Sequence, residues 1–183
     1  MYRLIAFIAL SAVLAYLSRS SLRISRSHGF YRFFGVVALL ALILLNINRW
    51  FVDPFSGHQI ASWLLLTISV ALVLSGASLL KVIGKPSSSR TSDVPLTGIE
   101  KTTVLVTRGI YRHIRHPIYA SGFYGGWGVF FKDPSWLGGI LALVSCGLWV
   151  ATARMEEAEC IRHFGEPYRE YMRGTRMFVP FLF

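Results

Sequence analysis

Cysteine and acidic residues are scarce in this chain of 183 residues, and their scarcity narrows what the protein can be. The two cysteines, Cys146 and Cys160, show no CxxC or Cys/His spacing, so neither a zinc site nor a disulfide framework is expected. Nine Asp and Glu residues stand against 19 Lys and Arg residues, which gives a net charge of +10. Such a charge would suggest a nucleic-acid partner if it covered a soluble face.

The basic residues instead cluster just outside long apolar runs, where membrane topology and anionic lipid headgroups explain them better. The chain is 54% hydrophobic and has a mean hydropathy of +0.51, which is too apolar for an ordinary soluble domain of this length. We therefore expect a single integral membrane domain with lipids around it, and we expect neither nucleic acid nor a metal as a partner.

Five apolar segments stand out, and none shows the period of two that indicates a strand. They are Leu4–Leu17, Phe33–Ile47, Ile60–Leu80, Ile118–Phe131 and Pro134–Ala153. A spanning helix needs about 20 apolar residues, which the third and fifth segments provide, whereas the others need their flanks. The sequence predicts an all-α, polytopic bundle of about five transmembrane helices with a cytoplasmic C-terminal helical segment. For the first segment a cleaved signal peptide is the alternative.

The loops indicate the orientation of the bundle. Basic residues concentrate between the first two segments, between the third and fourth, and after the fifth, whereas the other two loops carry only Arg49 and Lys132. By the positive-inside rule the N-terminus is outside and the C-terminus is cytoplasmic. We divide the domain into N-terminal spans (1–84), a cytoplasmic linker with a polar motif (85–117), a helical hairpin (118–153) and a cytoplasmic C-terminal segment (154–183). The linker is rich in Ser and Pro over Lys85–Thr97.

Polar residues gather in two places at the ends of apolar runs, Arg108–Tyr119 and the pair Glu156-Glu157 with the segment that follows it. Charge is expensive near a bilayer, so such a concentration is usually retained for chemistry. Pro117 suits the first turn of a helix, which places His116 at its N-cap, where free N–H groups and the helix dipole attract an anion. Topology explains the arginines of this stretch, but not its dense His, Tyr and Pro spacing.

Other residues have two interpretations. Glu156 could bind a cation or a sugar hydroxyl, or it could belong to a solvated helix face. The small-xxx-small pair Gly122 and Gly126 favours close packing against the fifth segment over contact with a ligand. Gly165 and Pro167 predict a helix end followed by a new helical turn, a segment that closes a pocket.

Taken together, these motifs resemble the isoprenylcysteine carboxyl methyltransferase family, in a wider group that includes phospholipid methyltransferases. The resemblance covers roughly Thr102–Pro180 and rests on Gly109-Ile110-Tyr111, Arg115-His116-Pro117 with Tyr119, the Glu-Glu pair, and Phe-Gly-x2-Tyr-x2-Tyr. It implies a membrane enzyme that uses S-adenosylmethionine to methylate a lipophilic small-molecule or prenylated acceptor. Carboxyl O-methylation of an isoprenylcysteine is the first expectation.

The resemblance also implies the site residues. The family's cofactor-binding positions fall on Thr103, Val104, Leu105, Val106, Tyr111, His116, Pro117, Ile118, Tyr119 and Glu156. One departure concerns the arginine that the family places four residues before the first Glu, where this chain has Thr152. That leaves Arg115 and Arg154 as the candidates for the catalytic residue that holds the acceptor's anion.

Three alternatives stay open. The acceptor could be the amino group of a phospholipid or another amino-lipid. Integral membrane sterol-type reductases, which bind NADPH, have a related C-terminal half, but the Glu-Glu pair fits a methyltransferase better. A non-catalytic membrane scaffold is the third alternative, and it would not need the polar cluster.

Overall fold

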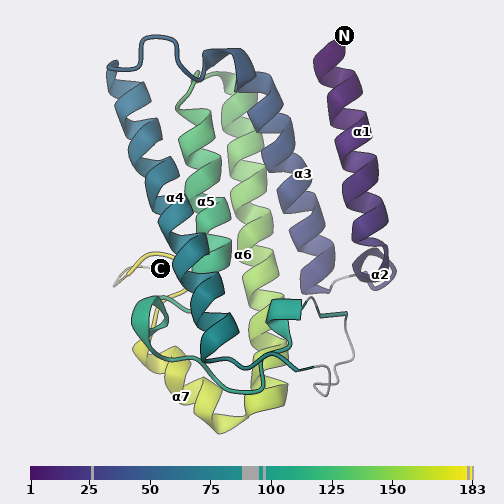
Figure 1. Ribbon diagram of the computed structural model, residues 1–183, viewed down its shortest axis with the longest axis vertical. Helices are drawn as coiled ribbons and strands as arrows, with labels where there is room; N and C mark the ends of the chain where they lie inside the picture. Colours follow the sequence, from purple (N-terminus) through teal and green to yellow (C-terminus); the bar gives the residue numbers. More distant parts are fainter. Residues whose placement is uncertain (26, 88–94, 97, 181, 183) are drawn as a thin grey trace.

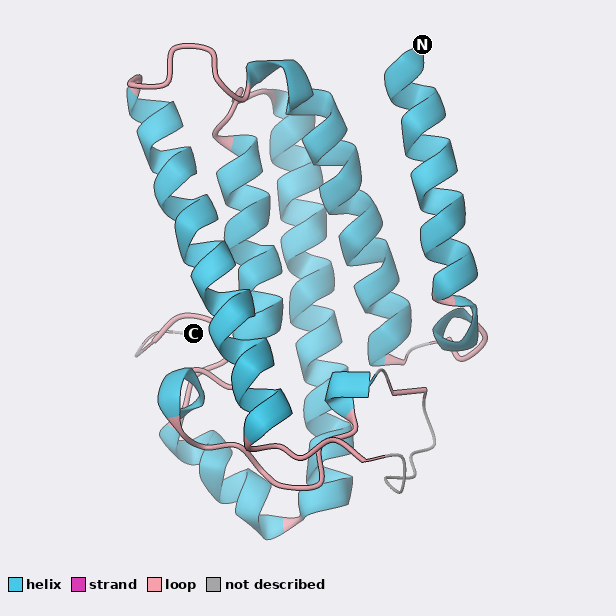
Figure 2. Cartoon of the chain, in the orientation of Figure 1, coloured by secondary structure: helices cyan, strands magenta, loops and turns pink. Residues whose placement is uncertain are grey.

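The computed structural model describes residues 1–25, 27–87, 95–96, 98–180 and 182 of the chain. Within these residues the regular structure is helical, and the β-type pairing found there is an isolated bridge between Ile114 and Arg176 (Figure 2). The predicted all-α fold class is confirmed for the described part of the chain.

Five apolar helices run side by side along the long axis of the molecule (Figure 1). They are α1 (Tyr2–Leu17), α3 (His28–Asn46), α4 (Gly57–Val82), α5 (Pro117–Phe130) and α6 (Trp136–Phe164). Three regions are long and apolar enough to cross a membrane, namely His28–Arg49, Gly57–Val82 and Trp136–Phe164. With 16 and 14 residues, α1 and α5 are shorter, so the count of five spans stays a prediction.

The remaining elements are short and lie at the ends of the bundle. They are α2 (Arg19–Leu22), η1 (Ile47–Arg49), η2 (Gly98–Glu100), η3 (Gly109–Arg112) and α7 (Glu166–Gly174). The last three gather at the end of the molecule that carries the C-terminal half of α6 (Figure 1). Most of the predicted linker, residues 88–94 and 97, lies outside the described residues. The division of the domain into four parts stays a prediction.

Local sequence signals explain where the helices begin and end. The side chains of Ser27 and Ser135 accept hydrogen bonds from backbone N–H groups in the first turns of α3 and α6. Pro117 begins α5, so His116 lies at the N-cap as predicted. Gly165 ends α6 with a φ of 67°, and Pro167 lies in the first turn of α7. The predicted helix end and new helical turn are therefore confirmed.

The large side chain of Trp149 on α6 is packed between two glycines. A Cβ atom added to Gly122 of α5 would lie 2.3 Å from the Trp149 ring, and one added to Gly35 of α3 would lie 3.4 Å from it. Gly126, one turn after Gly122, lies close to Cys146 of α6. The predicted packing of this glycine pair against the fifth segment is confirmed, and it lets α3, α5 and α6 approach one another closely.

A buried lysine joins the elements at the end of the bundle away from α7. The side chain of Lys132, in the α5–α6 loop, is 1% exposed, and its Nζ lies 3.3 Å from the centroid of the Trp63 ring. Lys132 Nζ also donates a hydrogen bond to Gln59 Oε1 on α4 at 3.0 Å. Burial lowers the pKa of this lysine. This end of the bundle is therefore closed by cation–π and hydrogen-bonding contacts.

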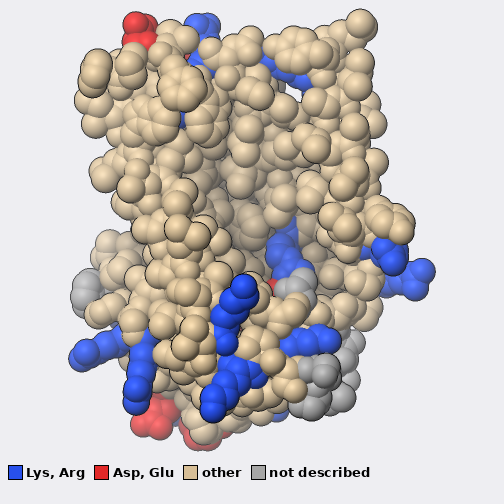
Figure 3. All heavy atoms as spheres, viewed as in Figure 1, with Lys and Arg blue, Asp and Glu red and all other residues tan. Residues whose placement is uncertain are grey.

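Charged side chains are unevenly distributed over the surface. In the view of Figure 3, Lys and Arg side chains gather around the end that carries α7, below a broad band that holds almost no charge. Apolar side chains of α1, such as Leu4, Ile5 and Ile8, are more than half exposed. An apolar band bordered by basic residues is typical of a protein embedded in a bilayer.

Candidate functional site

A cavity of about 460 Å³ lies at the end of the bundle that carries α7. Its wall is built from the C-terminal end of α1, from α3, the C-terminal end of α4, the segment that precedes α5, the first turn of α5, the last turns of α6, and α7. The volume falls in the range of about 300–1,000 Å³ that is usual for small-molecule sites. The cavity lies where the two polar clusters of the sequence meet.

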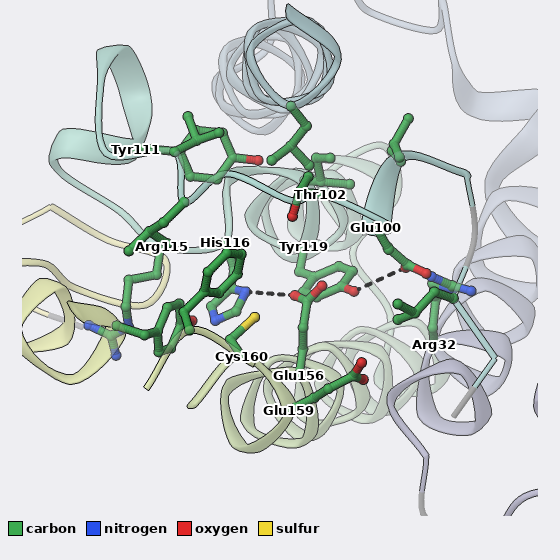
Figure 4. A pocket seen from close by; sticks show the side chains of 18 of the residues that line it. Arg32, Glu100, Thr102, Tyr111, Arg115, His116, Tyr119, Glu156, Glu159 and Cys160 are labelled. Atoms are coloured by element: carbon green, nitrogen blue, oxygen red, sulfur yellow. Dashed lines mark hydrogen bonds and ion pairs between the residues drawn. The ribbon is translucent and has the colours of Figure 1, made fainter. Parts of the chain in front are cut away.

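The first polar group consists of His116 and Glu156, which line the cavity, and of Glu157, the next residue of α6. His116 Nδ1 lies 3.1 Å from Glu156 Oε2, and His116 Nε2 lies 3.3 Å from Glu157 Oε1. Figure 4 shows His116 and Glu156 pointing toward each other. The histidine from the N-cap of α5 and the carboxylate from α6 therefore meet in the fold, although 40 residues separate them in the sequence.

The charge of His116 follows from its surroundings. Burial lowers the pKa of the imidazole, but the hydrogen bonds and charges of Glu156 and Glu157 outweigh burial and raise the pKa above its usual value. The raised pKa favours the imidazolium form. The site thus presents one cation and two carboxylates in a region that is largely closed to water.

The C-terminal segment is docked on the polar motif through Arg115. Its Nε donates to Glu157 Oε1 at 2.7 Å, and its Nη1 donates to the carbonyl oxygens of Met172 and Thr175. The hydroxyl of Tyr171 donates to the carbonyl oxygen of Tyr111 at 2.6 Å. These contacts dock α7 on the polar motif, and its Tyr168 and Tyr171 line the cavity. That the segment closes the pocket stays a prediction.

Tyrosine rings form much of the remaining wall. Burial raises the pKa values of Tyr111, Tyr168 and Tyr171, so their hydroxyl groups stay protonated and act as hydrogen-bond donors. The ring of Tyr119 stacks on that of His116, with 5.7 Å between centroids. Such rings offer flat apolar surfaces with polar edges to a planar ligand.

A second polar group lies in the same cavity and was not predicted. Arg32 of α3 forms an ion pair with Glu100 of η2, and the Tyr119 hydroxyl donates to Glu100 Oε1 at 3.5 Å. His28 of α3 lies between Glu100 and Glu159, at 3.5 Å and 3.6 Å from their Oε2 atoms. In Figure 4, Tyr119 and Glu156 separate His116 from the Arg32–Glu100 pair.

Most, but not all, of the residues predicted to bind the cofactor line the cavity. Seven of them line the cavity: Leu105, Val106, Tyr111, His116, Ile118, Tyr119 and Glu156. Three are not among the described residues that line it. Thr103 and Val104 are exposed, and Pro117 is buried, where it packs against the position of Gly76 on α4. Their predicted contacts with a cofactor stay predictions.

The two arginines predicted to hold the acceptor also differ in their relation to the cavity. Arg115 lines the cavity, whereas Arg154 is exposed and is not among the described lining residues. Thr152, at the family's arginine position, is fully buried and donates a hydrogen bond to the carbonyl oxygen of Leu148. In the described part of the chain, His, Cys, Asp and Glu side chains form no cluster of three or more that could hold a metal ion. The expectation of no metal partner stays a prediction.

Comparison with known proteins gives a family match. The sequence model described as Phospholipid methyltransferase matches residues 57–167. Protein-S-isoprenylcysteine O-methyltransferase from Homo sapiens is 31% identical over 123 residues, which is 66% of this chain and 43% of that protein. The Rattus norvegicus protein of the same name is 31% identical over 113 residues, which is 61% of this chain and 39% of that protein.

A further relative has a different name. The nickel-cobalt-cadmium resistance protein NccN of Alcaligenes xylosoxydans xylosoxydans is 38% identical over 82 residues, which is 44% of this chain and 38% of that protein. The chain spans about two fifths of the length of the curated relatives that it matches. No solved structure matches the chain.

Proposed function

The chain belongs to the phospholipid methyltransferase family, and on that premise we propose that it is a membrane enzyme that transfers a methyl group from S-adenosylmethionine to a lipophilic acceptor. One observation carries the proposal: His116 at the N-cap of α5 meets Glu156 of α6 in the wall of a cavity large enough for a small molecule. Membership of the family suggests methyl transfer. The contact between the His116 cation and the Glu156 carboxylate supports this cavity as the place where the methyl donor binds.

The residues present fit the methyl donor. S-adenosylmethionine carries a carboxylate, an ammonium group, ribose hydroxyls and a planar base. The N-terminus of α5 presents free N–H donors to the carboxylate, and the imidazolium of His116 adds positive charge there while its own N–H groups stay on Glu156 and Glu157. Glu156 is an acceptor for the ammonium group or a ribose hydroxyl. The rings of Tyr111 and Tyr119 offer surfaces for the base.

The protein's own contribution is to bind, orient and exclude water. When bound, S-adenosylmethionine supplies a sulfonium methyl group, which a nucleophile gains as the carbon–sulfur bond breaks and its electron pair remains on sulfur. A carboxylate nucleophile needs no general base, so the chain has to align the acceptor and keep water out. The buried Tyr168 and the partly buried Tyr171 of α7 line the cavity, which supports this role.

The acceptor follows from the relatives. Two of the relatives above are named as isoprenylcysteine O-methyltransferases, so we propose carboxyl O-methylation of an isoprenylcysteine-type acceptor. The family description favours one alternative, N-methylation of a phospholipid or amino-lipid. For the orientation we propose, on the positive-inside rule, that the cavity opens at the cytoplasmic face and that the N-terminus of the chain lies outside. The anion-holding roles of Arg115 and Arg154 stay predictions.

Ligand binding to the purified protein in detergent tests the proposal. We expect saturable binding of S-adenosylmethionine that His116→Ala and Glu156→Ala each weaken about tenfold or more, because each loses a charge-assisted contact. Glu166→Ala, which removes an exposed carboxylate on α7, is the matched control and should bind as the wild type does. Saturable NADPH binding without any response to S-adenosylmethionine or its demethylated product would favour a reductase and contradict the proposal.

A further inference from the structure

The family pattern does not say which cation of this cavity would hold the acceptor's carboxylate. An acceptor with a carboxylate needs a cation beside it, and the family's arginine position on α6 holds the buried Thr152. Among the described lining residues, the arginines are Arg32 and Arg115. Their surroundings differ in a way that assigns them different tasks.

Arg115 is committed to the fold. Its guanidinium joins Glu157 to the carbonyl oxygens of Met172 and Thr175, and so it ties the end of α7 to the start of α5. A substrate carboxylate that took this guanidinium would leave backbone carbonyl groups without their donor. Because leaving buried polar groups without a partner costs their full desolvation penalty, this exchange is unfavourable.

The ion-pair partner of Arg32 can be exchanged for a ligand. Its side chain is 22% exposed and pairs with the carboxylate of Glu100, a group of the same kind as an acceptor carboxylate. Glu100 also accepts a hydrogen bond from Tyr119 and lies 3.5 Å from His28 Nε2. An incoming carboxylate can therefore replace Glu100 on Arg32 while Glu100 keeps neighbours that stabilise its charge. A guanidinium also matches a carboxylate in a two-point geometry.

Arg32 also lies close to the residues proposed to bind the methyl donor, as methyl transfer to an acceptor held by Arg32 requires. Tyr119 lies between the two polar groups, since its ring stacks on His116 and its hydroxyl reaches Glu100. The Arg32–Glu100 pair is thus one side chain away from the residues proposed to bind the donor (Figure 4). Leu17 and Leu80 line the same cavity as Arg32 and offer an apolar surface to a hydrocarbon chain.

We propose that Arg32 is the residue that holds the acceptor's carboxylate, and that Glu100 occupies its guanidinium until the acceptor binds. The inference rests on the proposed function, because it specifies the acceptor end of the same cavity. It moves the anion-holding role from α6, where the family has it, to α3. It also predicts that the two members of the ion pair have opposite effects on an anionic acceptor.

The test compares a carboxylic acid with its uncharged amide. The probes are N-acetyl-S-farnesylcysteine and the corresponding carboxamide, whose binding to the purified protein is measured directly, without methyl transfer. The wild type should prefer the acid, and Arg32→Gln should weaken binding of the acid roughly 30-fold or more while the amide changes little. Glu100→Gln should instead strengthen binding of the acid, because it leaves Arg32 without a competing carboxylate.

Two further variants make the comparison strict. Arg23→Gln removes an exposed arginine of the same basic loop and should leave both affinities unchanged. Arg32→Lys keeps the charge but loses the two-point geometry, so its affinity for the acid should fall between those of the wild type and Arg32→Gln. Binding of S-adenosylmethionine should stay at the wild-type level in each variant, which reports that the donor end is folded.

Each outcome has a defined meaning. If Arg32→Gln keeps its affinity for the acid and still binds S-adenosylmethionine, the inference is wrong and the proposed function stands. Farnesylamine serves as a third probe, with an amine in place of the acid. If the wild type binds farnesylamine more tightly than N-acetyl-S-farnesylcysteine and Glu100→Gln abolishes that preference, the acceptor is an amine held by Glu100. That outcome also overturns the inference. A wild type that binds no S-adenosylmethionine refutes the proposed function, whereas the preference for acid over amide still reports on Arg32. If Arg32→Gln does not fold, Arg32→Lys and Glu100→Gln decide the question.

Discussion

At the scale of single residues, His116 is the side chain whose chemistry depends most on its neighbours. It is buried at a helix N-terminus, where the dipole disfavours a cation, yet Glu156 and Glu157 lie within 3.3 Å of its two ring nitrogens. Two carboxylates compensate one imidazolium, and Arg115 compensates the second carboxylate. A chain of alternating charges, three of whose four members line the cavity, therefore lies at this side of it.

This arrangement predicts a pH dependence. Because the folded pKa of His116 is raised, its ionic contacts contribute fully below the unfolded pKa of about 6.5, and that contribution is lost as the pH rises through the folded value. Thermal unfolding in detergent should show wild-type stability falling over this window relative to His116→Gln. His58→Gln, at an exposed histidine near the other end of the bundle, should keep the wild-type profile. A constant difference between the wild type and His116→Gln across the window would contradict the charge assignment.

At the scale of elements, α5 is short and rich in glycine because other helices approach it on two sides. Gly122 accommodates Trp149 of α6, and Gly128 accommodates Leu66 of α4, where an added Cβ would lie 2.9 Å from the leucine side chain. This close packing places the N-terminus of α5, and with it His116, between α4 and α6. The position of the site is therefore a consequence of helix packing.

Substitution of Gly122 tests this dependence. Gly122→Ala should destabilise the protein by about 1–3 kcal/mol, because its Cβ would clash with the rigid ring of Trp149. Gly147→Ala, on an open face of α6, is the matched control and should be neutral or slightly stabilising, since alanine favours a helix. Denaturation in detergent measures both. Equal stability of the two variants would show that α5 and α6 pack less closely than described.

At the scale of the whole molecule, the two ends of the bundle differ in kind. One end is closed by the buried Lys132 and its Trp63 and Gln59 contacts. The other end carries the cavity, α7 and most of the basic side chains visible in Figure 3. In the proposed orientation this second end faces the cytoplasm, where the proposed methyl donor and an acceptor from the lipid could both reach it.

Labelling of cysteines in intact cells tests this orientation. Phe55→Cys, in the α3–α4 loop at an 88% exposed position, should react with a membrane-impermeant maleimide. Glu170→Cys, at an exposed position of α7, should react only after the cells are opened. The wild type, whose Cys146 is buried and Cys160 half-buried, gives the background. The reverse pattern would place the cavity outside and contradict the proposed orientation.

Signals carried by neighbouring residues were sufficient for much of the architecture. Uninterrupted apolar runs predicted helices because a backbone in lipid has to satisfy its own hydrogen bonds. Pro117 and Gly165 predicted the start of α5 and the end of α6, since each acts through its own backbone geometry. The resemblance of the motifs to a known family led to His116 and Glu156, which line one cavity.

The group of Arg32, Glu100 and Glu159, which we propose as the acceptor end of that cavity, could not be foreseen in the same way. Arg32, Glu100 and Glu159 come from α3, a short 3₁₀ turn and α6, and no spacing along the chain connects them. In the sequence Arg32 is one of several basic loop residues, and its ion pair exists only because α3 packs against α6 near the segment that precedes α5. Short-range rules describe a backbone and its caps, but they do not say which distant charges share a cavity. Those pairings arise when the helices pack.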